Sequence, residues 1–210
     1  EARTLLDPAL RLMMHAVHRY EGTVNQVLGD GIMALFGAPL AHEDHAVRAC
    51  YAALAMQEAM RRYTEEVRHT HGVEVQLRVG LNSGAVVVRA IGDDLHMDYA
   101  AVGQTTHLAA RMEQLAPPGS VRLTADPLRL AEGFIEVTAL GLVPVKGLAE
   151  PVAVFELVGV TALRRRLQAA TARGLSPFVG RQPELAALRQ ALAQAGAGQG
   201  QVIALIGEPG

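Results

Sequence analysis

The chain has 210 residues, of which 50% are hydrophobic and 19% charged, and its formal net charge is −2. This balance supports a sizeable core and excludes collagen-like and strongly disordered classes. The small net charge gives no general attraction to nucleic acid or an anionic membrane. The 4% aromatic content, without tryptophan, argues against a stacking platform for single strands.

The single cysteine, Cys50, cannot form an internal disulfide, which suits a reducing compartment. No apolar run approaches the roughly 20 residues that a membrane span requires. The sequence has neither an initiating methionine nor a signal peptide. We therefore expect a segment of a longer cytoplasmic chain that contacts neither a membrane nor nucleic acid.

The first third of the chain predicts a helix, a hairpin and a second, longer helix. Apolar residues recur at helical spacing over 4–19, and β-rich runs cover 23–28 and 32–36. The Gly-Asp-Gly turn between these runs is a strong short-range hairpin signal. An inward stripe of alanine and methionine then indicates a helix over roughly 42–71.

Three strands and one further helix are predicted between the long helix and residue 119. The strands are expected over 73–81, 85–91 and 97–102, and the helix over about 104–116. The Pro-Pro-Gly sequence at 117–119 ends that helix.

The next elements complete the predicted fold. We expect a strand at 121–124, a short helix at 125–132, and strands at 135–145 and 151–158. The order of helix, hairpin, helix and strands predicts an α+β, ferredoxin-like fold. Such a fold normally begins with a strand before its first helix, and we expect this first strand to be missing from the sequence.

A change of composition near residue 160 predicts a linker and a second domain after a first domain at 1–159. Residues 160–176 are basic and helical in pattern, and we expect a solvated linker helix. A new unit then occupies 177–210, with a helix at about 182–195 and an apolar strand at 202–206.

The last four residues, Gly-Glu-Pro-Gly, follow the predicted strand as the opening of a phosphate-binding loop would. The same four residues also suit an ordinary turn. The stretch 178–188 resembles the entry to AAA-type and STAND-type ATPase domains. This resemblance implies the beginning of a P-loop ATPase domain, cut before its phosphate-binding lysine and therefore unable to hydrolyse ATP by itself.

Taken alone, Asp30 is a turn residue, since Asp-Gly turns are far commoner than metal sites. Its surroundings, however, resemble the metal-binding hairpin of class III adenylate and guanylate cyclases, and the resemblance continues in the same order over roughly 1–158. The segments that carry it are 23–37, 41–46, 77–84, 97–99, 102–105, 108–113 and 145–147. It implies the nucleotide cyclase fold, and bacteria contain such domains fused to ATPase-like modules.

The resemblance also implies a reaction in which the 3′-hydroxyl of a nucleoside triphosphate attacks its own α-phosphate and pyrophosphate leaves. Two Mg²⁺ or Mn²⁺ ions assist such displacements and prefer carboxylate oxygen. Asp30 matches one of the family's two metal-binding aspartates, and the other belongs to the first strand. We therefore expect this segment to be inactive by itself.

Further residues match family positions that contact the substrate. Arg78 matches an arginine that contacts phosphates, Arg111 the arginine that stabilises the transition state, and Lys146 the triphosphate-binding lysine. Gly29, beside Asp30, is placed with the substrate-binding residues. Each cation has a simpler alternative as a solvated surface charge. In the family two chains contribute to each site, which implies a homodimer.

Three positions depart from the family pattern. Gln26 stands where adenylate cyclases usually have a base-reading lysine. Ala100, which cannot form a side-chain hydrogen bond, stands where a second base-reading residue is usual. His107 replaces a ribose-orienting asparagine. His107 and Arg111 are four residues apart and share one helix face, which Gln104 joins.

These observations predict a purine nucleotide cyclase that acts on ATP or GTP, with cyclic AMP as the favoured product. The departures favour a second hypothesis, a nucleotide-sensing and dimerisation module that regulates the attached ATPase without turnover. A third hypothesis treats the cyclase fold as a scaffold alone. An aspartate on the missing strand would favour the enzyme, and an apolar residue there the sensor.

Overall fold

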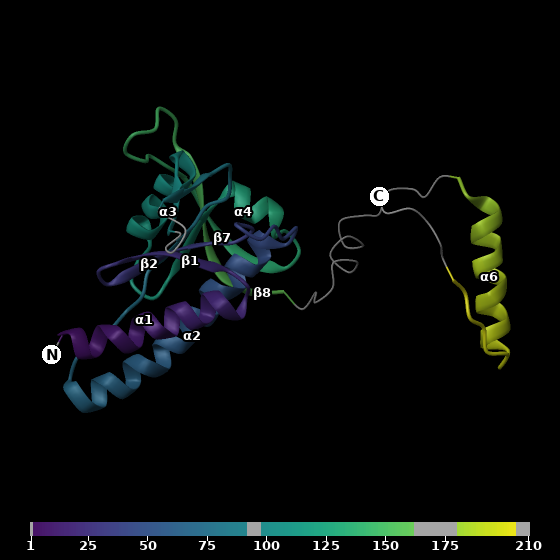
Figure 1. The fold of residues 1–210 in the computed structure, drawn as a ribbon, viewed down its shortest axis with the longest axis horizontal. Coiled ribbons are helices and arrows are strands. Elements are labelled where there is room, and N and C mark those ends of the chain that lie inside the picture. The colour runs from purple at the N-terminus through teal and green to yellow at the C-terminus, as the bar shows by residue number, and fades with distance from the viewer. Residues whose placement is uncertain (1, 92–97, 162–179, 205–210) are drawn as a thin grey trace. The chain divides into compact units, whose positions relative to one another are not determined.

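The computed structural model describes residues 2–91, 98–161 and 180–204. The chain divides into two compact units, Glu1–Arg173 and Gly174–Gly210, and each is described by itself (Figure 1). The predicted linker helix lies almost entirely outside the described residues, so the domain boundaries near 160 and 176 stay predictions.

The second unit contains helix α6 (Gln182–Gly196), which begins and ends close to its predicted limits. Residues 201–204 have no regular secondary structure, so the predicted strand at 202–206 is wrong for the part that is described. A strand needs a hydrogen-bonded neighbour, and the described part of this unit offers none.

The first unit begins with two helices that pack along each other and against a hairpin (Figure 1). These elements are α1 (Ala2–Arg19), β1 (Thr23–Leu28), β2 (Gly31–Leu35) and α2 (His45–His71). The two strands are antiparallel, and their register shifts between Val24 and Gln26. The buried side chains that join the helices are Met13, Ala16, Val17 and Met56.

A four-stranded sheet forms the centre of the first unit. Its strands are β3 (Val79–Leu81), β6 (Val121–Thr124), β8 (Val152–Val160) and β7 (Ile135–Val143), in that spatial order. β3 and β6 are parallel, while β8 is antiparallel to both of its neighbours. A separate antiparallel pair consists of β4 (Val87–Ile91) and β5 (Asp98–Val102).

Helices cover both faces of the sheet, which is why all four residues of β6 are buried. Val121 and Leu123 point into the core beneath α2, whose Cys50 belongs to the same cluster. The opposite face lies against α3 (Gln104–Leu115), where Met112 packs on Val154. The short helix α4 (Ala125–Leu130) follows β6 and contacts α2.

Most predicted elements are formed within a few residues of their expected limits, but residues 73–78 are not part of a strand. Their backbone groups bond instead to α2 side chains and to the turn before β6. Gln57 of α2 donates to the carbonyl of Leu77 at 3.0 Å, Thr64 donates to that of Val75, and the Gly119 amide also donates to Leu77. These partners replace a strand ladder, so only Val79–Leu81 pairs in the sheet.

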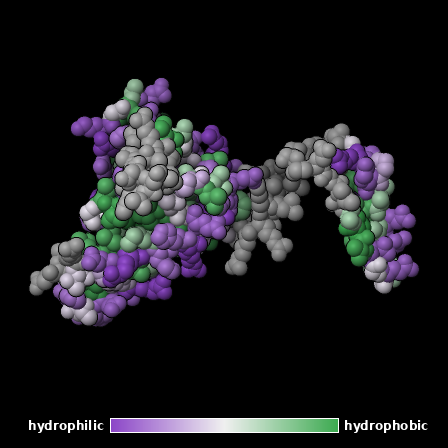
Figure 2. Space-filling model, in the orientation of Figure 1, coloured by the Kyte–Doolittle hydropathy of each residue, from purple (hydrophilic) through white to green (hydrophobic). Residues whose placement is uncertain are grey.

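The outer surfaces of α1 and α2 carry mostly hydrophilic side chains, as the amphipathic pattern predicted (Figure 2). Among the helices in the described ranges, none has both the length and the apolar character needed to cross a membrane.

Candidate functional site

A cavity of about 710 Å³ opens between α3 and the loop that joins β7 to β8. Its volume falls in the range usual for small-molecule sites. Two predicted site residues, Arg111 and Lys146, line it from opposite sides, and the predicted His107 lies one turn before Arg111. The lining residues are Gly103, Gln104, His107, Leu108, Ala110, Arg111, Gln114, Val145, Lys146, Gly147 and Leu148.

The place of α3 is set by Gly80 of β3, because the helix lies directly on the backbone of that strand. A Cβ at this glycine would come within 2.1 Å of the Glu113 amide nitrogen and 2.2 Å of the Ala109 carbonyl oxygen. No larger residue fits such a contact without moving the helix. Gly80 therefore sets the distance between α3 and the sheet, and this distance determines where Arg111 lies.

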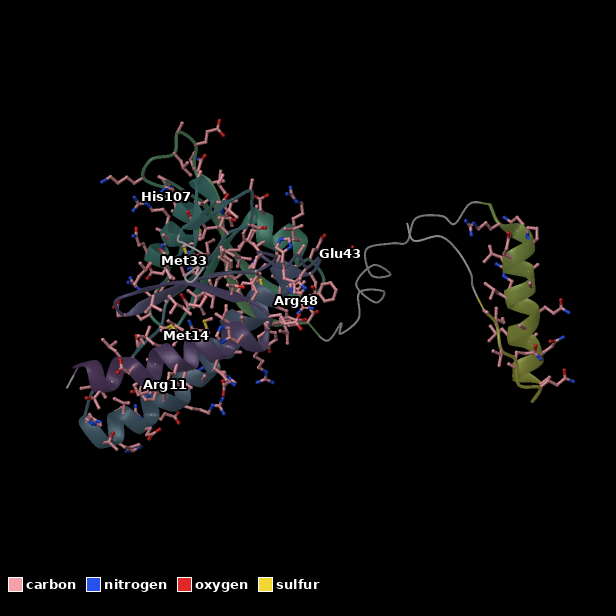
Figure 3. The ribbon with its side chains drawn as sticks, viewed as in Figure 1. Arg11, Met14, Met33, Glu43, Arg48 and His107 are labelled. Carbon is pink, nitrogen blue, oxygen red and sulfur yellow. The ribbon has the colours of Figure 1, made fainter. Side chains whose placement is uncertain are left out.

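The first turn of α3 is held by Asn82, which directly follows β3. Its side-chain amide donates to the carbonyl of Thr105 at 3.0 Å and accepts from the hydroxyl of Thr124 at 2.6 Å. Thr105 in turn donates to the carbonyl of Ala85 at 2.7 Å. These bonds hold the first turn of α3 in place, and His107, labelled in Figure 3, lines the cavity from this turn.

The guanidinium of Arg111 is positioned by its own helix, since its Nη1 donates to Oε1 of Gln114 at 2.7 Å. Lys146 lies across the cavity in the loop after β7, where Gly147 adopts a positive φ of 94°. The loop is anchored because Val145 is buried against Met112 of α3. The cavity is thus lined by two cationic side chains, with no acidic side chain among its described lining residues. The positive charge of Arg111 and Lys146 favours an anionic ligand.

The other predicted site residues lie outside this cavity. Asp30 is exposed at the tip of the β1–β2 hairpin, where Gly29 takes a φ of +64° that favours glycine. Gln26 is exposed on β1, beside the register shift. Ala100 pairs with Arg89 in the β4–β5 ladder, and its side chain lies outside the described part of the chain.

Arg78 directly precedes β3 and forms an ion pair with α3, its Nη2 lying 3.1 Å from Oε1 of Glu113. Sequence reasoning singled out Arg78 and Arg111 but missed the partners that hold them, Glu113 and Gln114. The i,i+3 spacing from Arg111 to Gln114 was a usable signal. The partner of Arg78 was not readable, because it lies far along the chain and meets Arg78 only through the fold.

Asp30 offers the hard carboxylate oxygen that Mg²⁺ or Mn²⁺ prefers, and its exposure leaves the oxygens free to bind. In the described ranges no group of three or more acidic, histidine or cysteine side chains gathers to hold a metal ion. The residues present therefore fit one ligand of a shared metal site and do not form a complete one.

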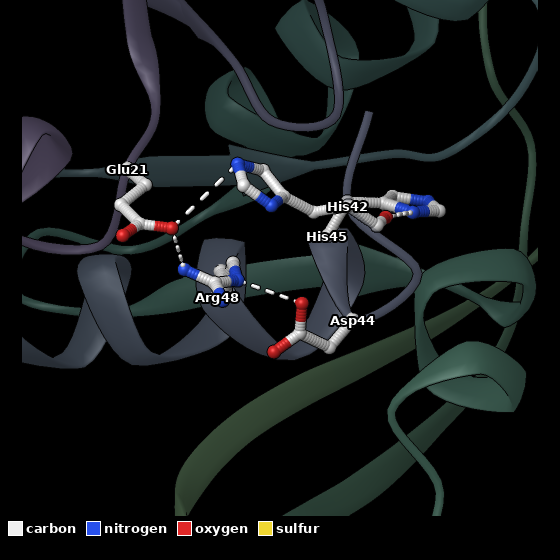
Figure 4. Close-up of polar contacts among 5 residues, drawn as sticks. All are labelled: Glu21, His42, Asp44, His45 and Arg48. Atoms are coloured by element: carbon white, nitrogen blue, oxygen red, sulfur yellow. Dashed lines mark hydrogen bonds and ion pairs between the residues drawn. The ribbon is translucent and has the colours of Figure 1, made fainter. Parts of the chain in front are cut away.

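A polar cluster ties the start of the hairpin to the start of α2 (Figure 4). Arg48 bridges Glu21 at 2.5 Å and Asp44 at 2.7 Å, and His42 Nε2 lies 3.6 Å from the same Glu21 carboxylate. The hydrogen bond from Arg48 lowers the pKa of Asp44 below its usual value. His45 bonds the carbonyl of His42 at 3.0 Å through Nδ1 and lies 3.3 Å from the Ser83 hydroxyl through Nε2, so both of its ring nitrogens have partners.

The first unit thus combines a mixed α+β fold with a cavity whose lining carries two cations. A family model described as the adenylate and guanylate cyclase catalytic domain matches residues 3–159. The chain therefore belongs to the adenylate and guanylate cyclase catalytic domain family.

Curated relatives include adenylate cyclase 1 of Rhizobium meliloti, 28% identical over 174 residues that make up 82% of this chain and 26% of that protein. The human guanylate cyclase soluble subunit beta-2 is 32% identical over 136 residues, which are 64% of this chain and 20% of that protein. The chain thus spans about a quarter or less of the length of these relatives.

Solved structures show the same fold. The adenylyl cyclase CyaB from P. aeruginosa has a TM-score of 0.71 at 28% identity, over 76% of this chain and 83% of that one. The guanylyl cyclase Cya2 has a TM-score of 0.70 at 28% identity, over 77% and 82% of the two chains. The predicted α+β nucleotide cyclase fold is confirmed by these likenesses.

Proposed function

We propose that the first unit is the catalytic domain of a purine nucleotide cyclase that converts ATP to 3′,5′-cyclic AMP and pyrophosphate, with GTP as the alternative substrate. The observation that carries this proposal is the cavity that Arg111 and Lys146 both line, with no acidic side chain among the described lining residues. Family membership supports the reaction class.

In this reaction the 3′-oxygen forms a bond to the α-phosphorus, the bond from that phosphorus to the bridging oxygen breaks, and the hydroxyl proton passes to water. Arg111 donates hydrogen bonds to the phosphoryl oxygens as negative charge grows on them. Lys146 binds the triphosphate and then the departing pyrophosphate. Because Gln114 and the anchored loop hold both cations in place, little reorganisation is needed during the reaction.

A divalent metal ion at Asp30 would stabilise the attacking and leaving oxygens. Because neither Asp30 nor Arg78 lines the cavity of Arg111 and Lys146, we assign both to the other half of a shared site, where Arg78 contacts the phosphates. Two copies of the chain would complete it as a homodimer, each contributing one half to each of two sites.

The base is read, in this proposal, by Gln26 on the hairpin. A glutamine amide both donates and accepts hydrogen bonds and therefore suits adenine or guanine, whereas Ala100 offers no side-chain partner. His107 lines the cavity beside Arg111 and would take the ribose-orienting role through a ring nitrogen.

The departures at Gln26, Ala100 and His107 favour one second candidate, a nucleotide-sensing and dimerisation module without turnover. In either case we propose that the unit from about residue 177 begins a P-loop ATPase domain that the cyclase-type domain regulates. The Gly-Glu-Pro-Gly sequence and the resemblance of residues 178–188 to the entry of ATPase domains support this assignment.

The test measures cyclic AMP and cyclic GMP made by the intact protein with Mg²⁺ and with Mn²⁺. Arg111→Ala is expected to lower the rate by about 10²–10³-fold, because one well-placed donor to the transition state is lost. Asp30→Ala is expected to remove activity, whereas the exposed Arg61→Ala on α2 serves as the control and keeps it. Full activity in Asp30→Ala would refute the site, and tight ATP binding without product would favour the sensor.

A further inference from the structure

Arg78 forms an ion pair with Glu113, although the proposed function has this arginine contact the phosphates of the substrate. Arg78 Nη2 and Glu113 Oε1 are 3.1 Å apart, and the side chains are 46% and 38% exposed. The pair is therefore open to solvent and to ions. The guanidinium faces a carboxylate where the proposed site requires a phosphate.

Glu113 cannot withdraw from Arg78 by a shift of the helix that carries it. Its amide nitrogen lies against Gly80, two residues beyond Arg78, so close that a Cβ on that glycine would come within 2.1 Å of it. The two side chains therefore separate only by rotation about their own bonds.

Paired with Glu113, Arg78 presents almost no net charge to an approaching polyphosphate, and the carboxylate repels it. An arginine has five N–H donors and a flexible side chain, so it can exchange the carboxylate for phosphate oxygens. Such an exchange between solvent-exposed partners shifts affinity only modestly.

We propose that Glu113 is an internal competitor of the phosphates for Arg78, which weakens polyphosphate binding and speeds the release of pyrophosphate. This inference rests on the proposed function, because that function assigns Arg78 to the phosphates. Glu113 is a positioning residue that acts through Arg78. A ligand with several phosphates also binds Lys146 and Arg111 of a second copy. These additional contacts compensate for displacing the Glu113 carboxylate from Arg78 better than the contacts of a monophosphate do.

The test uses inorganic pyrophosphate as the probe, with binding measured by calorimetry on the intact protein. Glu113→Gln keeps a side-chain oxygen for Arg78 but removes the charge, and Glu113→Ala removes both. Competition predicts that both variants bind pyrophosphate about two- to five-fold more tightly than the wild type, the range expected for an exposed pair. A purely orienting role predicts weaker binding in Glu113→Ala and no gain in Glu113→Gln.

Two controls make the result specific. Asp126→Asn removes the same charge from another exposed pair, with Arg129 at 2.9 Å, and should leave binding unchanged. In an Arg78→Gln background the gain from Glu113→Gln should disappear. A gain that persists there, unchanged or weaker binding in both Glu113 variants, or a wild type that binds no pyrophosphate would each overturn the inference.

Cyclase assays separate this inference from the proposed function. If the intact protein makes cyclic nucleotide, Glu113→Gln should show stronger product inhibition by pyrophosphate and a lower KM with little change in single-turnover rate. If it makes none, the proposed function fails, but tighter pyrophosphate binding in both Glu113 variants would still support the inference. Normal turnover with unchanged pyrophosphate inhibition would overturn the inference and leave the function standing.

Discussion

The thiol of Cys50 lies in the core between α2 and the central sheet and is fully buried. Burial raises its pKa from 9.0 to about 12, because the thiolate would lose its hydration there. The side chain therefore behaves as a small apolar group that packs against its neighbours. Sequence reasoning assigned it to a reducing compartment without locating it in the core.

We expect Cys50 to resist alkylation by iodoacetamide at pH 8 in the folded protein and to react fully in urea. The pKa of the Cys50 thiol is higher in the folded chain than in the unfolded chain. Its contribution to the free energy of unfolding is therefore present below pH 9 and is lost as pH rises toward about 12. Mass spectrometry of the labelled protein and urea titrations at pH 8 and 10.5 provide the measurements. Rapid labelling of the folded chain would contradict the buried position.

Single residues also mark the limit of prediction from sequence. Arg111 and Lys146 were placed by motif, and the fold brings them to one cavity. Asn82, which holds the first turn of α3 and the end of β6, had no signal of its own. Its partners are 23 and 42 residues away, and a polar side chain acquires such a role only when distant segments meet.

At the scale of elements, the contact between β3 and α3 is the most constrained feature of the site. Gly80→Ala would place a methyl group inside the van der Waals shell of backbone atoms, which cannot rotate away as a side chain would. We expect a loss of at least about 1–3 kcal/mol in the free energy of unfolding. The displaced helix should also lower cyclase activity, because it carries Arg111.

Gly159→Ala is the matched control, since the new Cβ on β8 would lie 3.8 Å from its nearest neighbour, an ordinary contact. Urea denaturation followed by circular dichroism compares the two variants with the wild type. Equal stability of both alanine variants would mean that α3 does not lie on β3 as described.

Periodicity located most elements because helix and strand patterns are local properties of the sequence. It misassigned 73–78, whose β-rich composition suggested a strand. Side chains of α2 and the Gly119 amide form hydrogen bonds with the backbone of this segment in place of a neighbouring strand. A local sequence pattern does not reveal such distant partners.

At the scale of the whole molecule, the proposed homodimer predicts complementation between inactive chains. Asp30→Ala and Arg111→Ala damage opposite halves of the shared site, so a mixed dimer contains one intact site and one doubly damaged site. Mixing equal amounts should recover up to about a quarter of wild-type activity, since half of the randomly formed dimers are mixed and each has one working site.

The measurement is cyclic nucleotide production by each variant alone and by the mixture after co-refolding or long incubation. A mixture of Arg111→Ala and Lys146→Ala, which damage the same half, is the control and should recover nothing. Activity of a single chain at infinite dilution, or no recovery in the first mixture, would contradict a shared site.

The sequence by itself determined the class of fold, the family and the order of the elements, because helix period, turn residues and the motif around Asp30 are local features. It also named the cations of the candidate site. Only the tertiary structure decided which of them share a cavity and which partners hold them. Contacts such as that between Arg78 and Glu113 depend on the packing of α3 against Gly80, and no local pattern encodes that packing.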